Sequence, residues 1–380
     1  SRRLEGALAA GPETVVTGDG SRKSTLAAEF VANATGAIWA LSFAGLLGTE
    51  VLVAAKAALG RLGETLDGVV PSATVASQTG HPRQVKNDMA VEDEEGVYGG
   101  LVEQPRVLLD LADRLVLQKP PGWEVLRSNA DEPEVGEGPR QLVGYVRALF
   151  PSHRWPIFSD VAHHYGFLHR LDVPGSGLIL TAKTYAAYYD LLLQLNVGEV
   201  LRDYHVVCHG WIPPGRREIS SRVHWIRGLT SPSAVCLQGK PSRTQICVSA
   251  HASHRGMAMS LISVRIATGR RHQIRIHSAH IGHVTARDGK YAASPTFASD
   301  RGWCRWNFVH RFRVCFKDAA GGAHAEQVAF PLELDRALRQ LSPRSGASGQ
   351  ALRECLDQAY ATSDKEAFET PGIGALIIER

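Results

Sequence analysis

The clearest hydrophobic pattern in the chain is a short apolar run near its centre. The run 178–180, Leu-Ile-Leu, follows the turn-forming residues Pro174, Gly175 and Gly177. A continuous apolar run of this length, bounded by Pro and Gly, is typical of a buried strand. Asp172 stands just ahead of the turn, so we expect one carboxylate at the edge of the core.

The remaining pattern mixes helical and strand periods. Tyrosines and leucines recur at helical spacing between 183 and 196, which predicts a helix whose tyrosines serve in packing. Short alternating runs bounded by Gly, Pro and Ser predict strands in an antiparallel sheet. The predicted strands lie in two runs between Val107 and Lys119 and at 200–213, 219–267, 303–316 and 330–334, with further helices at 140–150 and 350–360.

Composition divides the chain into four parts. Residues 1–80 are rich in Ala, Gly, Thr and Val, and their apolar run 37–49 predicts a helix against the core, because a membrane span needs ~20 residues. Prolines and an acidic run mark 81–104 as a linker. We place the main domain at 105–340 and a polar appendage at 341–380. We expect a monomer without a membrane partner.

Charge is uneven along the chain although its total is small. The chain has 380 residues, 44% apolar and 21% charged, which is typical of a soluble globular protein, and a formal net charge of +4. Between Arg265 and Lys290, five arginines, one lysine and four histidines stand against a single acid, Asp288. This local basic segment, rather than the total charge, favours a nucleic acid as partner.

Cysteine and histidine spacing argues against a metal centre. The six cysteines form no CxxC pair, which indicates reduced thiols in an intracellular compartment, the cytosol or an organelle. The histidines at 163, 164 and 169, and those at 280 and 283, lack the Cys or carboxylate partners of a zinc site, so we predict no metal. Because the chain begins with Ser1 rather than Met, we expect further residues ahead of it.

Two stretches carry a more specific signal. His-Arg-Leu-Asp at 169–172 precedes the turn and the apolar strand, and Thr-Gly-Arg-Arg-His-Gln-Ile-Arg at 268–275 opens the basic segment, which ends in Asp288 and Lys-Tyr at 290–291. Together they resemble the two signatures of the RluA-type pseudouridine synthases. The Lys-Pro-Pro-Gly turn at 119–122 resembles a third feature of that family. The resemblance covers about residues 105–340.

The resemblance implies a fold and a reaction. We expect an α+β catalytic domain with a mixed, mainly antiparallel sheet, flanking helices and a central cleft. The family converts uridine in RNA to pseudouridine by breaking the bond between the sugar and uracil N1, turning the ring, and joining C5 to the same sugar carbon. This isomerisation needs no cofactor and no metal. The implied partner is RNA, whether ribosomal, transfer or another.

The resemblance also implies roles for single residues. Asp172 is the expected essential acid, either as a nucleophile at the sugar or as the base that removes a sugar proton. Arg275 is expected to pair with Asp172 and keep it ionised. Tyr204, in a K-x-Y motif whose lysine is Arg202 here, is expected to stack near the uracil and remove the late proton. The expected substrate-binding residues are His169, Arg170, Arg270, Arg271, His272, Gln273, Ile274 and Lys290.

The chain departs from the family pattern beside both signatures. Gly175 stands where the family has a threonine ahead of Ser-Gly, which removes a hydroxyl from the loop after Asp172. In the second signature, Val284 replaces a proline and Arg287 replaces the glycine of a Gly-Asp pair.

Other functions fit parts of the same pattern. A catalytically degenerate member of the family would use the basic segment only to bind RNA. Glycoside hydrolysis usually needs two carboxylates, and no second acid stands out near either signature. Without any chemistry, Asp172 would pair with Arg170 or cap its turn, and the arginines of the basic segment would solvate one strand face.

Overall fold

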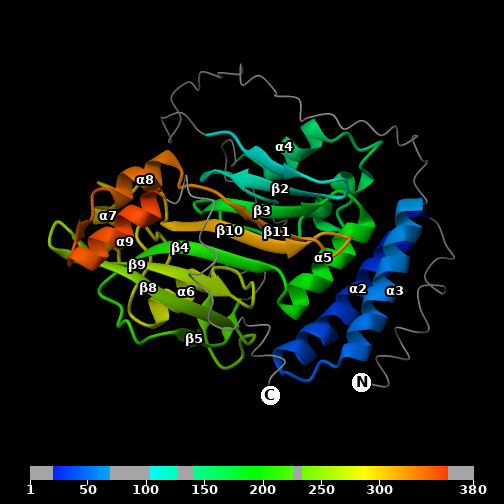
Figure 1. Cartoon of the computed structure of the whole chain (residues 1–380), viewed down its shortest axis with the longest axis horizontal. Helices are drawn as coiled ribbons and strands as arrows, with labels where there is room; N and C mark the ends of the chain where they lie inside the picture. The colour runs from blue at the N-terminus through cyan, green and yellow to red at the C-terminus, as the bar shows by residue number, and fades with distance from the viewer. Residues whose placement is uncertain (1–19, 69–102, 127–139, 226–232, 358–380) are drawn as a thin grey trace.

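A single large sheet organises the molecule (Figure 1). The computed structural model describes residues 20–68, 103–126, 140–225 and 233–357. The main path of the sheet runs through β1 (Arg106–Asp110), β2 (Arg114–Lys119), β3 (Ser176–Ala182), β10 (Val309–Lys317), β4 (Leu201–His209), β9 (Met257–Ile266), β8 (Arg243–His254) and β12 (Ser342–Pro343), while β11 (Ala323–Gln327) pairs with β10 and β5 (Glu218–Ser220) with β8. β3 pairs with β10 in parallel, and the other pairs of this sheet are antiparallel. The predicted α+β class with a mixed, mainly antiparallel sheet is confirmed.

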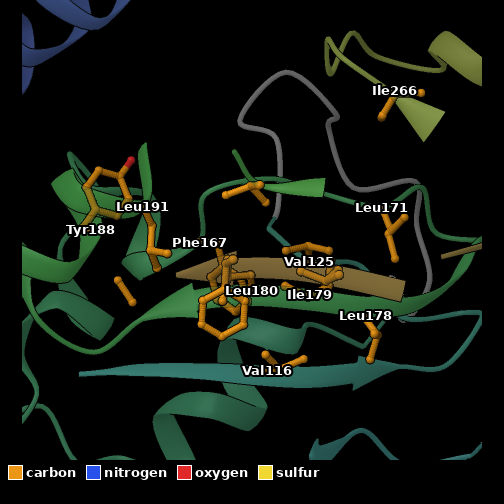
Figure 2. Close-up of a cluster of buried hydrophobic side chains, with 14 of the residues drawn as sticks. Val116, Val125, Phe167, Leu171, Leu178, Ile179, Leu180, Tyr188, Leu191 and Ile266 are labelled. Carbon is orange, nitrogen blue, oxygen red and sulfur yellow. The ribbon is translucent and has the colours of Figure 1, made fainter. Parts of the chain in front are cut away.

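The apolar run at 178–180 forms the buried middle of β3. Figure 2 shows its three side chains beside Val116 of β2 and Phe167, which precedes β3 in the chain. Ile179 lies opposite Leu117 in the antiparallel register between β2 and β3. Helices cover the sheet around this strand, so every residue of β3 is buried and the strand carries no polar alternation.

Helix α5 (Tyr185–Val197) follows β3 directly and confirms the helix predicted at 183–196. The Thr184 side chain caps its first turn by accepting from Ala187 N at 3.2 Å. Gly198 ends it in the left-handed conformation, with φ +82°, which glycine adopts without steric cost. The three tyrosines of the helix are buried, as the packing interpretation requires.

Two segments are helical where the sequence indicated strands. The basic segment, whose arginines are placed on one strand face in the interpretation without chemistry, contains α6 (Gln273–His280), and the predicted strand at 330–334 runs into α8 (Leu332–Leu338). Residues 273–278 are buried without interruption. A helix enclosed on several sides has no polar face, so its period cannot be read from a few apolar positions.

The smaller elements complete the covering layers. The helix predicted at 140–150 is confirmed as α4 (Leu142–Leu149). The others are η2 (Pro156–Ser159), η3 (His164–Gly166), α7 (Ser294–Asp300) and the two short paired strands β6 (Val223–His224) and β7 (Ala234–Val235).

The N-terminal region contributes a helical hairpin that packs on α5. Helix α2 (Gly20–Phe43) and helix α3 (Thr49–Gly68) lie along α5 in Figure 1. The Asp67 carboxylate accepts from the backbone of Tyr185 at 2.9 Å and of Ala186 at 3.0 Å, which caps α5 from outside. Gly63 is needed at this junction, because a Cβ there would lie 2.4 Å from Ala186 Cα. The run at 37–49, predicted as one helix, is helical only to Phe43 before α3 begins.

The C-terminal region from 341 also packs on the sheet. β12 pairs with the end of β8, and α9 (Gly346–Asp357) contacts both strands. Residues 358–380 and most of the predicted linker, 81–102, lie outside the described residues. No helix in the described ranges is both long and apolar enough to cross a membrane.

Candidate active site

Asp172 occupies the turn that leads into β3. Its carbonyl accepts from Gly175 N at 3.0 Å, which closes the turn. Gly177, with φ +117°, brings β3 against β10 so closely that a Cβ would collide with the Arg311 backbone. The pairing of these two strands therefore requires glycine at 177. The Asp172 carboxylate keeps 23% exposure, so it stands at the surface of the core.

The partner of Asp172 is Arg275, as the sequence predicted. Arg275 Nη1 donates to Asp172 Oδ2 at 2.9 Å, across 103 residues of chain. The opposite edge of the guanidinium donates to the buried Asp288 carboxylate, from Nε at 2.8 Å and from Nη2 at 2.7 Å. A fork held at both edges cannot rotate, so its direction toward Asp172 is fixed.

Asp288 is the residue that holds this arrangement in place. Besides Arg275 it accepts from Thr285 Oγ1 at 3.0 Å and from the backbone of Lys290 at 2.9 Å and Tyr291 at 3.1 Å. Burial opposes its charge, but the hydrogen bonds and charge of Arg275 outweigh burial and lower the pKa of Asp288 below its usual range. The carboxylate is thus fully occupied and stays ionised.

The charge on Asp172 is stabilised by the same guanidinium. Burial disfavours its ionised form, yet the neighbouring His272 and Arg275 more than offset burial and lower the pKa of Asp172. Burial also lowers the pKa of His272 to about 4, so that ring is neutral at neutral pH. We therefore assign the opposing charge at pH 7 to Arg275, and Asp172 is ionised.

Tyr204 points to a second buried arginine, Arg311 of β10. Arg311 donates to the Tyr204 hydroxyl oxygen from Nε at 2.8 Å and from Nη2 at 2.5 Å. Its Nη1 donates to Leu178 O at 2.9 Å and to His169 Nδ1 at 2.7 Å. Arg311 therefore ties β4, β3 and the His-Arg-Leu-Asp segment together beneath the site.

The basic loop ahead of α6 is built on Gln273. Its side-chain oxygen accepts from Thr268 Oγ1 and Arg270 N, and its nitrogen donates to Arg243 O and Thr244 Oγ1. The sequence predicts a substrate contact for Gln273. The structure instead uses the whole amide to hold the loop.

The other predicted substrate-binding residues differ in exposure. Ile274 is buried in the main core, whereas Arg170 and Lys290 are exposed. His272 lies nearest the acid, with Nε2 3.7 Å from Asp172 Oδ1, and its ring shares a hydrogen bond of 2.9 Å with the Tyr291 hydroxyl. Arg270 and Arg271 lie over tryptophan rings at the outer side of the loop.

The structure accounts for one of the departures from the family pattern. Arg287 has the left-handed backbone, with φ +60°, that a glycine would adopt at lower cost. Its N–H donates to the buried Asp300 carboxylate at 2.7 Å, and its guanidinium lies 4.2 Å from the Phe297 ring centroid. These contacts offset a strain of about 1 kcal/mol.

Arg202, in place of the family's lysine, is buried and charged. Its Nη2 donates to Ile266 O at 3.4 Å, and burial lowers its pKa to about 10. It adds positive charge beside Tyr204 and Arg311.

Sequence reasoning missed three residues of this site. Asp288 had a signal, since it is the single acid in the basic segment. Arg311 had none, because an alternating strand does not reveal that its arginine points inward. Lys119 was noted only as part of a turn. Its buried amino group donates to Trp123 O at 2.8 Å and Val173 O at 3.3 Å, which joins that turn to the Asp172 loop.

Comparison with known proteins finds a family match over the middle of the chain. Residues 115–280, which contain Asp172, Tyr204 and Arg275, match the RNA pseudouridylate synthase family. The RluA-type resemblance of the two signatures is confirmed by relatives named ribosomal large subunit pseudouridine synthase D.

The pseudouridine synthase match covers only part of each protein. The chain is 32% identical over 184 residues to an uncharacterized RNA pseudouridine synthase of Mycobacterium bovis, covering 48% of this chain and 58% of that protein. It is 33% identical over 184 residues to ribosomal large subunit pseudouridine synthase D of Yersinia pestis, covering 48% and 51%. The solved structure of human RNA pseudouridylate synthase domain containing 1 aligns with 67% of this chain and 97% of its own, at 23% identity and a TM-score of 0.48. The chain thus spans about half the length of the curated relatives it matches.

Proposed function

We propose that this protein isomerises uridine to pseudouridine in RNA, without a cofactor, through Asp172. The observation that carries the proposal is the ion pair between Asp172 and Arg275. Asp288 fixes the far edge of the guanidinium, so Asp172 is held ionised in one direction. Both routes open to the acid, attack on the sugar carbon and removal of a sugar proton, need a carboxylate in that state.

The reaction rearranges the bonds of the substrate without a net gain or loss of atoms or electrons. The bond between the sugar and uracil N1 breaks, the ring turns, and a bond from C5 to the same sugar carbon forms. The proton on C5 leaves, and N1 takes up a proton, so nothing is oxidised. The protein must therefore supply one carboxylate for the sugar and one base for the C5 proton.

Tyr204 is proposed as the base for C5. Arg311 donates to its hydroxyl oxygen twice, and a guanidinium in that position favours an oxygen that carries negative charge, which is the form of a tyrosine that can accept the C5 proton. We expect Tyr204→Phe to keep RNA binding within about twofold and to lower product formation by about 100-fold or more, in the range of a lost general base. Product formation in a single-turnover experiment is the measurement. An unchanged product yield would remove Tyr204 from the scheme.

RNA is proposed as the substrate because of the surface around Asp172. A uridine stacked in RNA hides its sugar bond, so it must be extruded, and phosphate contacts must hold the strand meanwhile. Arg170 is two residues from Asp172 in the chain and interacts with its charge. Arg271 and Lys290 are cations near His272, which lies beside Asp172. The relatives named for the large ribosomal subunit make ribosomal RNA the first substrate to test.

The experiment is incubation of the full chain with separate pools of ribosomal, transfer and messenger RNA. We expect pseudouridine at defined positions in one pool, together with release of tritium from C5-labelled uridine. A chain that binds RNA but forms no pseudouridine in any pool would overturn the proposal and establish the RNA-binding alternative. The turn at Gly175 gives that alternative no support, because its backbone still closes on Asp172.

A further inference from the structure

Two aromatic rings at the end of α2 face the basic loop. Trp39 and Phe43 are one helical turn apart and stack on each other, with centroids 5.2 Å apart and planes inclined by 29°. Both side chains are partly exposed. They belong to the N-terminal hairpin, which lies outside the matched residues 115–280.

Two arginines from other elements cover these rings. Arg270, from the loop ahead of α6, has its Cζ 4.6 Å from the centroid of Trp39. Arg243, the first residue of β8, has its Cζ 5.5 Å from the centroid of Phe43. A third pair continues the pattern, since Arg271 lies 5.1 Å from the ring of Trp225, which is 38% exposed. These six residues, Phe43, Arg243, Trp39, Arg270, Arg271 and Trp225, form an aromatic–arginine row.

The row is linked to the candidate active site through the backbone. Arg271 precedes His272, whose Nε2 is 3.7 Å from Asp172 Oδ1. Gln273 bonds both Arg270 N and Arg243 O, so the two outer arginines have fixed positions relative to the acid. The row therefore leads outward from Asp172 to the N-terminal hairpin.

Packing alone does not explain the row. Asp67 and Gly63 already fix the hairpin on α5. Arg243 Nε lies 3.5 Å from Glu218 Oε1, but among the described residues no carboxylate lies within ion-pair distance of Arg270 or Arg271. Arg270 Nη2 donates to Pro241 O at 3.3 Å, whereas its Nε has no acceptor. Partly buried guanidinium groups without a counter-charge are poised for an anion from outside the chain.

We propose that the aromatic–arginine row binds the single-stranded RNA that flanks the target uridine. Aromatic rings and guanidinium planes stack with unpaired bases, and the same guanidinium groups neutralise phosphates. A paired duplex cannot use the rings, because its bases already stack within the helix. The inference rests on the proposed function for the position of the target at Asp172.

Binding of fluorescent RNA across a salt series tests the row. We expect Trp39→Ala to weaken binding of a hairpin RNA with a single-stranded flank by about tenfold, with the salt slope unchanged, because stacking releases no counterions. Arg270→Ala should lower the slope instead. Trp39→Phe keeps a ring and should restore most of the affinity. Binding of a blunt duplex should be the same for wild type and Trp39→Ala.

Trp211→Ala is the matched control. Trp211 also lies against an arginine, Arg344, at 3.9 Å, but at the opposite end of β8, where its Nε1 donates to Ala252 O. We expect wild-type RNA affinity from this variant. Three results would each overturn the proposed surface. Trp211→Ala could lose as much RNA affinity as Trp39→Ala, or Trp39→Ala could lose as much affinity for the blunt duplex as for the flanked RNA. The third result is wild-type affinity for flanked RNA in Trp39→Ala.

The experiments distinguish a wrong proposal about the aromatic–arginine row from a wrong proposal about pseudouridine formation. If wild type forms pseudouridine but Trp39→Ala binds flanked RNA normally, the row is rejected and the function stands. If wild type forms no pseudouridine but Trp39→Ala loses flank-dependent binding, the function is rejected and the row remains an RNA-binding surface.

Discussion

Replacing Asp172 by Asn should abolish pseudouridine formation, with a loss of more than about 10⁴-fold, the upper end for one positioned acid–base group. The amide keeps the volume of the carboxylate and still accepts from Arg275, so RNA affinity should change by less than about threefold. What disappears is the ionised oxygen that either route at the sugar requires. Single-turnover formation of pseudouridine and equilibrium binding on the same RNA measure the two effects.

Asp190→Asn is a close control for this change. Asp190 is also paired with an arginine, Arg114 at 3.0 Å, and its exposure of 21% matches the 23% of Asp172. It lies on α5, away from both signatures. We expect wild-type turnover from Asp190→Asn. Turnover retained in Asp172→Asn would contradict the mechanism, and equal losses in both variants would show that the effect is structural.

Arg275→Ala should also collapse turnover, because it removes the counter-charge of Asp172 and leaves the buried Asp288 unpaired. Removing one partner of a buried ion pair costs about 3–5 kcal/mol of folding free energy, so we also expect a lower melting temperature for this variant. Arg275→Lys separates the two effects. It keeps a charge but cannot hold both carboxylates in a fork, and we expect a folded protein with turnover lowered by about 100-fold.

A second buried fork, which joins strands β9 and β4 of the sheet, provides the control. Arg265 donates to the buried Asp203 from Nε at 2.6 Å and from Nη2 at 2.8 Å, without touching Asp172. Arg265→Lys should destabilise the fold as Arg275→Lys does, yet keep turnover per folded molecule. Thermal melting and turnover measured on both variants decide the matter. If turnover falls in proportion to the loss of stability in both variants, Arg275 has only a structural role.

The sequence by itself determined the local parts of this protein. The run at 178–180 is continuous and bounded by turn residues, so only a buried strand suited it, and α5 carries its cap, its period and its terminal glycine in neighbouring positions. Asp172 could be placed on its turn for the same reason. The two signatures then indicated the resemblance to the RluA-type pseudouridine synthases, because their residue types stand at fixed spacings within short segments.

Only the tertiary structure decided which distant side chains meet. Asp288 and Arg311 complete the candidate site through contacts with Arg275 and Tyr204, and Arg311 and Tyr204 are 107 residues apart in the chain. No local pattern reports that an arginine of β10 turns inward. Helix α6 could not be read from the sequence because residues 273–278 are all buried, which removes the polar positions that reveal a helical period. The contact of Trp39 with Arg270 joins the N-terminal region, whose sequence carries no motif, to the loop of the second signature. This contact forms only when the N-terminal hairpin packs on α5.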